Sequence, residues 1–153
     1  GDDCMLKGIP KIIPPLLLKL LSEMGHGDTL VIADGNFPSE SVGKGLAVVR
    51  LDGHGVPEVL DAVISLMPLD QYVEQPVALM ERCPGDDADI SIWQTYYEIL
   101  KRHEGRGPED CRLLERFEFY EEAKKAYCII ATTEKSQYAN LILKKGCIIE
   151  GNG

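Results

Sequence analysis

Apolar residues recur along this chain with two spacings, one typical of helices and the other of buried strands. Helical spacing, with apolar residues three or four positions apart, occurs at 16–24, 56–67, 92–100 and 119–126. Short apolar runs occur between these segments, at 29–33, 46–51, 77–80, 127–132 and 140–143, with a weaker candidate at 112–116. Because strands alternate with helices, we predict an α/β fold in which one sheet is sandwiched between helices on both faces.

The ends of the predicted elements are marked by proline and glycine. Pro14 and Pro15 suit the start of the first helix, and Gly25 is expected to cap its carboxyl end. No repeat or low-complexity segment divides the chain, so its length predicts a single domain over residues 1–153. We expect residues 1–4 to be either a remnant ahead of a natural start at Met5 or disordered.

Charge and composition narrow the class of protein. Sixteen basic against 25 acidic residues give a net charge of -9, which argues against nucleic acid and anionic membranes as partners. No apolar run approaches the roughly 20 residues of a membrane helix. The start Gly1-Asp2-Asp3 is acidic, whereas a secretory signal begins with basic residues. We therefore expect a cytoplasmic protein.

The sequence gives no sign of a metal or nucleotide cofactor. Its five cysteines are odd in number and form no C-x-x-C pair, and Cys128 suits a buried apolar position. The segment Gly43-Lys44-Gly45 is not a phosphate-binding loop, because Pro38 replaces the required first glycine and Gly45 replaces the final Ser or Thr. We therefore predict no cofactor and no metal site.

His26 is the first residue with a candidate chemical role. It lies between Gly25 and Gly27, where a helix is expected to end and a strand to begin. Imidazole gains and loses a proton near neutral pH, which suits general acid–base catalysis. The alternative is a turn histidine bonded to Asp28, and a metal site built from these two residues alone would lack ligands.

Polar residues next to predicted strands are candidates for ligand binding. Asp34 follows a buried strand, and ligands of α/β proteins bind beyond the carboxyl ends of strands. Asp34 could accept hydrogen bonds from sugar hydroxyls or simply cap a turn, and Asp70 has the same two interpretations. Tyr138 and Asn140 open the last strand and offer donors and acceptors, although turn chemistry also favours Asn there.

The segment 115–120 combines charge with aromatic rings. Its sequence, ERFEFY, could supply core aromatics with solvated charges. It could also form a carbohydrate-binding wall, in which Arg116 donates to ring hydroxyls and the Tyr120 hydroxyl moves a proton.

Taken together, these segments resemble the family of L-fucose mutarotases and D-ribose pyranases. The resemblance extends from residue 5 to 146 and depends on four motifs in the family's order, EMGHGD at 23–28, ADGNFP at 33–38, ERFEFYEEAKKA at 115–126 and YAN at 138–140. Gly27, the pair Phe37-Pro38 and a long insert at 84–108 are typical of the fucose branch, whereas Ala139 is more typical of the ribose branch.

This resemblance implies a ribose pyranase-like three-layer fold and a cofactor-independent isomerase that interconverts sugar anomers. It implies that His26 and Tyr120 transfer protons. It also implies a set of residues that hold the monosaccharide, namely Asp34, Asp70, Arg116, Tyr138 and Asn140. The family forms ring-shaped homodecamers with sites completed by neighbouring subunits, so the resemblance implies a homo-oligomer as well.

Two rival functions fit the same motifs. A sugar-binding protein without turnover would need the hydroxyl-holding residues but not the pair His26 and Tyr120. A D-ribose pyranase would use the same chemistry on a different sugar.

Overall fold

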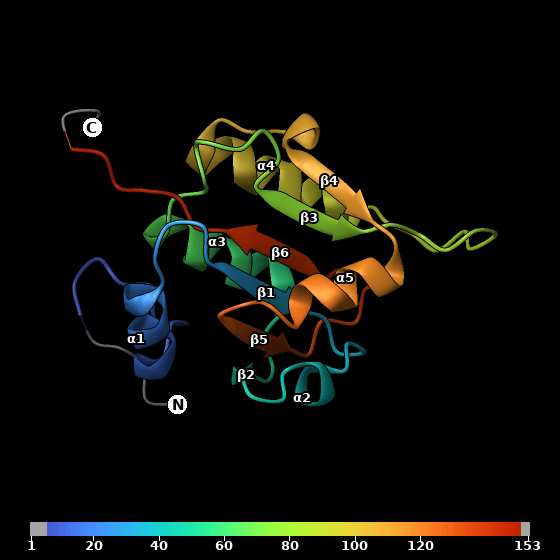
Figure 1. Ribbon diagram of the computed structural model, residues 1–153, viewed down its shortest axis with the longest axis horizontal. Helices are drawn as coiled ribbons and strands as arrows, with labels where there is room; N and C mark the ends of the chain where they lie inside the picture. Colours follow the sequence, from blue (N-terminus) through green and yellow to red (C-terminus); the bar gives the residue numbers. More distant parts are fainter. Residues whose placement is uncertain (1–5, 151–153) are drawn as a thin grey trace.

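Figure 1 shows the computed structural model of the chain, in which residues 6–150 are described. The helices are α1 (Pro15–Glu23), α2 (Ser39–Val42), α3 (Val56–Leu66), α4 (Ile92–Glu104) and α5 (Arg116–Ala123), with a 3₁₀ turn, η1 (Pro108–Asp110). The strands are β1 (Thr29–Ala33), β2 (Ala47–Leu51), β3 (Val77–Met80), β4 (Cys111–Leu114), β5 (Cys128–Thr132) and β6 (Leu141–Lys144). The expectations about residues 1–4 and a start at Met5 lie outside the described residues.

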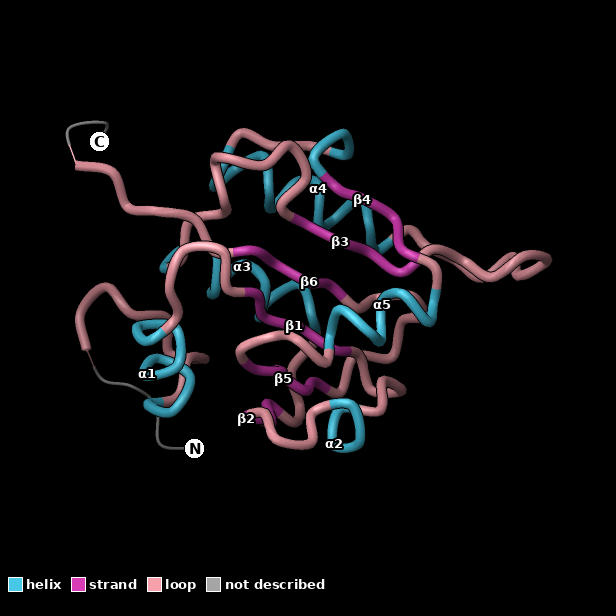
Figure 2. Tube along the Cα trace, viewed as in Figure 1, coloured by secondary structure: helices cyan, strands magenta, loops and turns pink. Residues whose placement is uncertain are grey.

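The strands form one six-stranded sheet in the order β2-β5-β1-β6-β3-β4, drawn in magenta in Figure 2. All neighbouring pairs are parallel except those of β6, which runs antiparallel to both β1 and β3. Ile32, near the carboxyl end of β1, therefore lies opposite Leu141, the first residue of β6. This register brings the residues that follow β1 next to those that precede β6.

Helices cover both faces of the sheet, which confirms the predicted sandwich. Successive side chains of a strand point to opposite faces, and in β1 the side chain of Ile32 joins one core and that of Val31 joins the other. The first core includes residues of α1, α3 and α4, and the second includes residues of α2 and α5. In Figure 1, α5 crosses in front of the sheet while α3 and α4 lie behind it. Cys128 is fully buried in the first core, as predicted.

The end of α1 differs from the prediction that Gly25 caps it. Met24 ends the helix in an extended conformation, and Gly25 does not adopt a left-handed one. The reason is a distant residue: the Lys145 ammonium donates to the carbonyl oxygens of Leu21 and Met24 at the helix end. Because a lysine satisfies these carbonyls, no glycine cap is needed.

Helices α4 and α5 also differ from their expected bounds by several residues. The helix expected from residue 119 begins at Arg116, because the Glu115 carboxylate accepts hydrogen bonds from the backbone N–H groups of Phe117 and Glu118. Helix α4 continues to Glu104, beyond the expected end of the pattern, and stops at Gly105, whose φ of 66° is left-handed. The short helix α2 was not predicted, since four residues are too few to establish a helical period.

The helices of the described region are short. None of those found within residues 6–150 combines the length and the apolar character that crossing a bilayer requires.

Candidate functional site

The candidate site residues gather at two opposite ends of the sheet. One cavity, of about 220 Å³, lies beyond the carboxyl end of β1 and is lined by Asp34, Arg116, Tyr120, Tyr138 and Asn140. We call it the β1-end cavity. The two remaining candidates, His26 and Asp70, contact each other at the amino end of β1. The structure thus brings most of the candidate residues together and separates this pair from them.

Asp34 and Asn140 meet in the β1-end cavity because β1 and β6 are antiparallel. The backbone N–H of Asp34 donates to Oδ1 of Asn140 at 2.7 Å. In return, one Asp34 carboxylate oxygen accepts from the N–H of Asn36 and the other from the N–H of Ala139. Both side chains are almost completely buried. Residues more than a hundred positions apart therefore form one fixed unit of carboxylate and amide.

Burial controls the charge of Asp34. Removal from water raises the pKa of its carboxyl group above the usual value, and the negative charge of Glu134 acts in the same direction. Hydrogen bonds from the backbone N–H groups of Asn36, Ala139 and Phe37 oppose this increase. A buried carboxylate of raised pKa is a strong hydrogen-bond acceptor, and a hydrogen bond from a ligand hydroxyl would stabilise its negative charge.

Tyr138 has a left-handed backbone, with a φ of 55°, which non-glycine residues rarely adopt. Helix α4 holds this backbone in place from behind the sheet. The indole N–H of Trp93 donates to the carbonyl oxygen of Tyr138 at 2.8 Å, and the Tyr96 hydroxyl donates to that of Ala139 at 2.7 Å. The helix in the 84–108 insert thus fixes the segment that carries two of the candidate residues.

The opposite wall of the β1-end cavity comes from the start of α5. Arg116 and Tyr120 lie one helical turn apart, and Nε of Arg116 donates to the Tyr120 hydroxyl oxygen at 3.2 Å. The guanidinium carbon also lies 5.6 Å from the centre of the Tyr120 ring, within cation–π range. Phe37 packs edge-on against the same ring. The segment fits both interpretations in part, because Phe119 is fully buried in the second core while Arg116 and Tyr120 line the β1-end cavity.

Several residues that line the β1-end cavity were not among the candidates: Asn36, Phe37, Met80, Cys83, Asp86 and Gln137. Asn36 and Phe37 lie within the motif at 33–38, so their place beside Asp34 was a usable signal. Asp86 belongs to a Gly/Asp-rich loop whose composition indicates only a turn, and nothing local connects it to Tyr138.

His26 forms an ordered pair with Asp70 at the other end of the sheet. Its Nε2 lies 2.9 Å from Oδ1 of Asp70, and the His26 side chain is 45% exposed while that of Asp70 is 4% exposed. Asp28, the alternative partner considered for His26, instead accepts a hydrogen bond from the N–H of Gly25. The ring of Tyr72 lies beside the imidazole, with centroids 5.4 Å apart.

The Asp70 carboxylate is held in its charged form. Burial alone would raise its pKa, but hydrogen bonds from the N–H of Tyr72 and from His26 outweigh that effect and lower the pKa. A carboxylate beside Nε2 fixes the orientation of the imidazole. The pair therefore resembles an acid–base group with its orienting partner.

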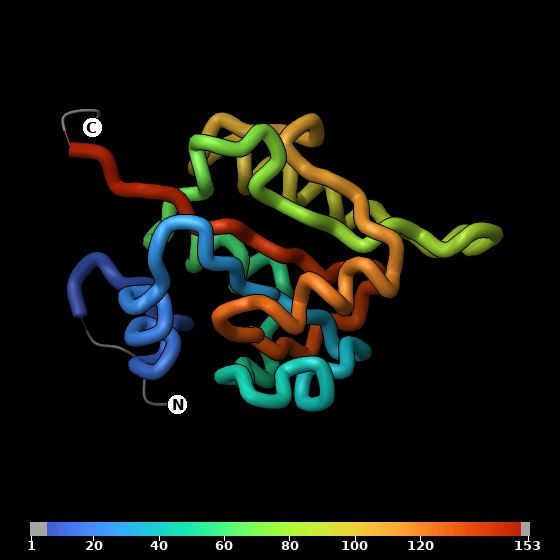
Figure 3. The backbone as a smooth tube through the Cα atoms, in the orientation of Figure 1, coloured from blue at the N-terminus to red at the C-terminus, as the bar shows by residue number. Residues whose placement is uncertain are grey.

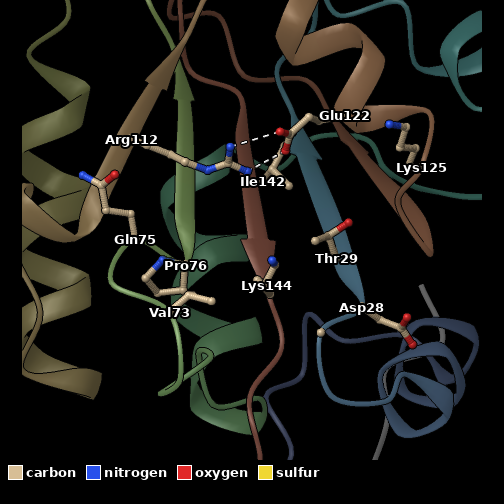
Figure 4. A pocket seen from close by; sticks show the side chains of 11 residues that line it. Asp28, Thr29, Val73, Gln75, Pro76, Arg112, Glu122, Lys125, Ile142 and Lys144 are labelled. Carbon is tan, nitrogen blue, oxygen red and sulfur yellow. Dashed lines mark hydrogen bonds and ion pairs between the residues drawn. The ribbon is translucent and has the colours of Figure 1, made fainter.

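A larger cavity, of about 510 Å³, lies on the α5 face of the sheet and contains none of the candidate residues. Figure 4 shows Arg112 reaching Glu122 across it, with Lys125 and Lys144 nearby. The guanidinium and carboxylate form a bidentate ion pair, so their charges are directed at each other. We therefore place the candidate site in the β1-end cavity, which is lined by five of the seven candidate residues.

Metal ligands do not cluster in the described part of the chain. Within residues 6–150, no three His, Cys, Asp or Glu side chains are arranged to hold a metal ion.

The sequence matches the model of the RbsD / FucU transport protein family over residues 7–148. The chain belongs to the RbsD / FucU family. Among solved structures of the family, FucU from Bifidobacterium longum is 59% identical, with a TM-score of 0.92 over 94% of this chain and 100% of that one. The fucose mutarotase from Streptococcus pneumoniae, solved in complex with L-fucose, is 49% identical, with a TM-score of 0.87 over the same shares of the two chains.

A curated RbsD / FucU relative from Mus musculus is named fucose mutarotase. It is 46% identical to this chain over 151 residues, which cover 94% of this chain and 95% of the relative. The family resemblance inferred from the four motifs is thus confirmed, as is its α/β fold.

Proposed function

We propose that this protein is a cofactor-independent mutarotase that interconverts the α and β anomers of L-fucose. The observation that carries the proposal is the β1-end cavity, where a buried carboxylate, an amide, a guanidinium and two phenols surround one small space. Its volume of about 220 Å³ is below the roughly 300–1,000 Å³ of drug-sized sites, as suits a monosaccharide. The relatives named fucose mutarotase support fucose as the sugar.

Mutarotation requires only a few catalytic groups from the protein. A base removes the proton of the anomeric hydroxyl while an acid delivers one to the ring oxygen, and the ring opens to an aldehyde. The C1–C2 bond then rotates and the ring closes on the other face. An acid, a base and groups that hold the remaining hydroxyls are sufficient for this chemistry.

The proposed roles follow from the side chains. Asp34 accepts hydrogen bonds from sugar hydroxyls, Asn140 donates to them through its amide NH₂ group, Arg116 also donates, and Tyr138 holds a hydroxyl. Tyr120 and His26 transfer protons. Asp70 acts on the sugar indirectly, by orienting the His26 imidazole. Its Oδ1 lies beside the imidazole and already accepts a hydrogen bond from the N–H of Tyr72.

A single chain cannot bring His26 and Tyr120 to the same sugar in this fold. Asp28 and Asp34 flank β1 at its two ends, and six residues at about 3.3 Å each put these ends about 20 Å apart. Proton transfer needs hydrogen-bond contact, directly or through one water. We therefore propose that the site forms between two copies, with Tyr120 from one chain and His26 from its neighbour.

This arrangement requires a homo-oligomer, and we propose the homodecamer implied by the family resemblance. We also propose that the protein acts in the cytoplasm, where free monosaccharides are metabolised. Light scattering should give a mass near that of ten chains, and an active monomer would refute the shared site.

Saturation-transfer NMR on reducing sugars tests the function. Catalytic amounts of protein should accelerate exchange between the anomer signals of L-fucose more than exchange among the forms of D-ribose. A sugar-binding protein without turnover would broaden or shift the signals and leave the exchange rate at that of the buffer. A stronger effect on ribose would instead support the pyranase.

A further inference from the structure

We infer that Asp86, in the loop between β3 and α4, is a positioning residue that makes the Tyr138 hydroxyl a fixed hydrogen-bond acceptor for the sugar. The inference rests on the proposed function and adds a residue to its site. Figure 3 shows this loop, in yellow-green, projecting beyond the end of the sheet. Asp86 nevertheless lines the β1-end cavity together with Tyr138 and Arg116.

The contacts of the Tyr138 hydroxyl determine what it can offer a ligand. It donates its only proton to Oδ2 of Asp86 at 2.6 Å, a short hydrogen bond to a charged acceptor. Its oxygen accepts from the backbone N–H of Cys83 at 3.2 Å. A phenol has one proton, so the capacity that remains is that of an acceptor. A sugar hydroxyl must therefore donate to Tyr138.

The loop holds the Asp86 carboxylate ready for this contact. The N–H of Asp86 donates to the carbonyl oxygen of Cys83, which closes a turn. Oδ1 of Asp86 accepts from the N–H of Ala88, and the Arg82 guanidinium donates to the carbonyl oxygen of Ala88. One carboxylate oxygen thus anchors the loop and the other is directed at Tyr138.

The pKa shifts of Asp86 and Tyr138 agree with a hydrogen bond in which the Tyr138 hydroxyl donates to the Asp86 carboxylate. The hydrogen bond from Tyr138, together with that from Ala88, lowers the pKa of Asp86 and keeps it an anion. The same hydrogen bond to Asp86 raises the pKa of Tyr138 to about 12, so its hydroxyl keeps the proton. Across the cavity, Arg116 can only donate. A sugar hydroxyl that binds between them accepts from Arg116 and donates to Tyr138.

The first test follows the ionisation of Tyr138. In the parent, Tyr138 should stay protonated at pH 11, whereas in Asp86→Ala its pKa should fall toward about 10, the value for an ordinary tyrosine. Ultraviolet difference spectra, with Tyr138→Phe to identify the signal, measure this change. Asp87→Ala is the matched control, because it removes the same charge from the next position. An unchanged Tyr138 titration in Asp86→Ala would overturn the inference, and so would equal shifts in the two alanine variants.

The second test separates positioning from direct sugar contact. Asp86→Ala should raise KM for fucose roughly 10-fold, the effect of one charge-assisted hydrogen bond, with little change in kcat. Asp86→Asn should recover part of that loss, since its amide oxygen can still accept from Tyr138. In a Tyr138→Phe background, Asp86→Ala should have no further effect on KM. A further 10-fold loss there would show that Asp86 binds sugar directly and would overturn the positioning role.

The two tests also distinguish this inference from the proposed function. A parent protein that exchanges no anomers would refute mutarotase activity, while the titration would still decide whether Asp86 orients Tyr138. Circular dichroism checks that each variant is folded, which is expected because Asp86 and Asp87 are both exposed.

Discussion

Mixed oligomers of two inactive variants should recover activity if His26 and Tyr120 act on one sugar from different chains. His26→Ala and Tyr120→Phe should each lose about 10²–10⁴-fold in anomer exchange, the usual contribution of general acid–base catalysis. This loss corresponds to roughly 3–5 kcal/mol of barrier at 1.36 kcal/mol per factor of ten. Neither variant alone can form an intact pair.

The expected recovery follows from counting sites. When equal amounts of the two chains assort at random, about one quarter of the sites pair an intact Tyr120 from one chain with an intact His26 from its neighbour. The mixture should therefore regain about a quarter of the parent rate. Even if each single variant retained as much as 1% of the rate, the gain on mixing would be about 25-fold.

The assay combines refolding with NMR. The two chains, carrying different affinity tags, are unfolded together, refolded and purified through both tags in sequence, which ensures that the oligomers are mixed. Saturation-transfer NMR then measures exchange between fucose anomers. As a matched control, His26→Ala is mixed with the double variant His26→Ala/Tyr120→Phe, which cannot restore any pair. Mixed oligomers that stay as slow as either single variant would refute the shared site.

Other predictions concern the β1-end cavity. Asp34→Asn and Arg116→Lys should each weaken fucose binding roughly 10-fold or more in calorimetric titration, because each alters a charge-assisted hydrogen bond. The pKa of Asp34 is raised in the folded state, so its contribution to stability is present at acid pH and lost as the pH rises. Asp34→Asn should consequently gain more in melting temperature relative to the parent at pH 7 than at pH 3.5, as scanning calorimetry can measure. Trp93→Phe removes the hydrogen bond to the Tyr138 carbonyl and should raise KM with a smaller effect on kcat. Dialysis against a strong chelator should leave anomer exchange unchanged, and a loss that a divalent metal restores would contradict the cofactor-independent mechanism.

The elements of the sheet were predictable because their signals are local. The strands at 29–33 and 77–80 have the predicted bounds, since continuously apolar runs of this length are typical of strands buried on both faces. Four motifs were enough to identify the family. The end of α1 was not predictable in the same way, because its carbonyl groups are satisfied by Lys145, more than a hundred residues away.

The candidate site was predictable as a set of residues but not as an arrangement. Asp34 and Asn140 meet only because β6 lies next to β1 and runs antiparallel to it. Local sequence patterns predict neither the order nor the direction of strands in a sheet. The separation of His26 from Asp34, by contrast, could have been deduced: they precede and follow the same predicted strand, and an extended strand keeps its ends apart. No pattern in the sequence predicts the hydrogen bond between Asp86 and Tyr138.

The left-handed backbone of Tyr138 has a consequence for the thermodynamics of sugar binding. A non-glycine residue in this conformation costs roughly 1–2 kcal/mol, and here the hydrogen bonds from Trp93 and Tyr96 hold it in place without any ligand. The conformational entropy of this segment is therefore lost during folding and not again when the sugar arrives. Amide hydrogen exchange of residues 138–140 should accordingly be slow in the free protein and change little on addition of fucose. Sugars that bind weakly would then be recognised by a segment that is already ordered before they bind.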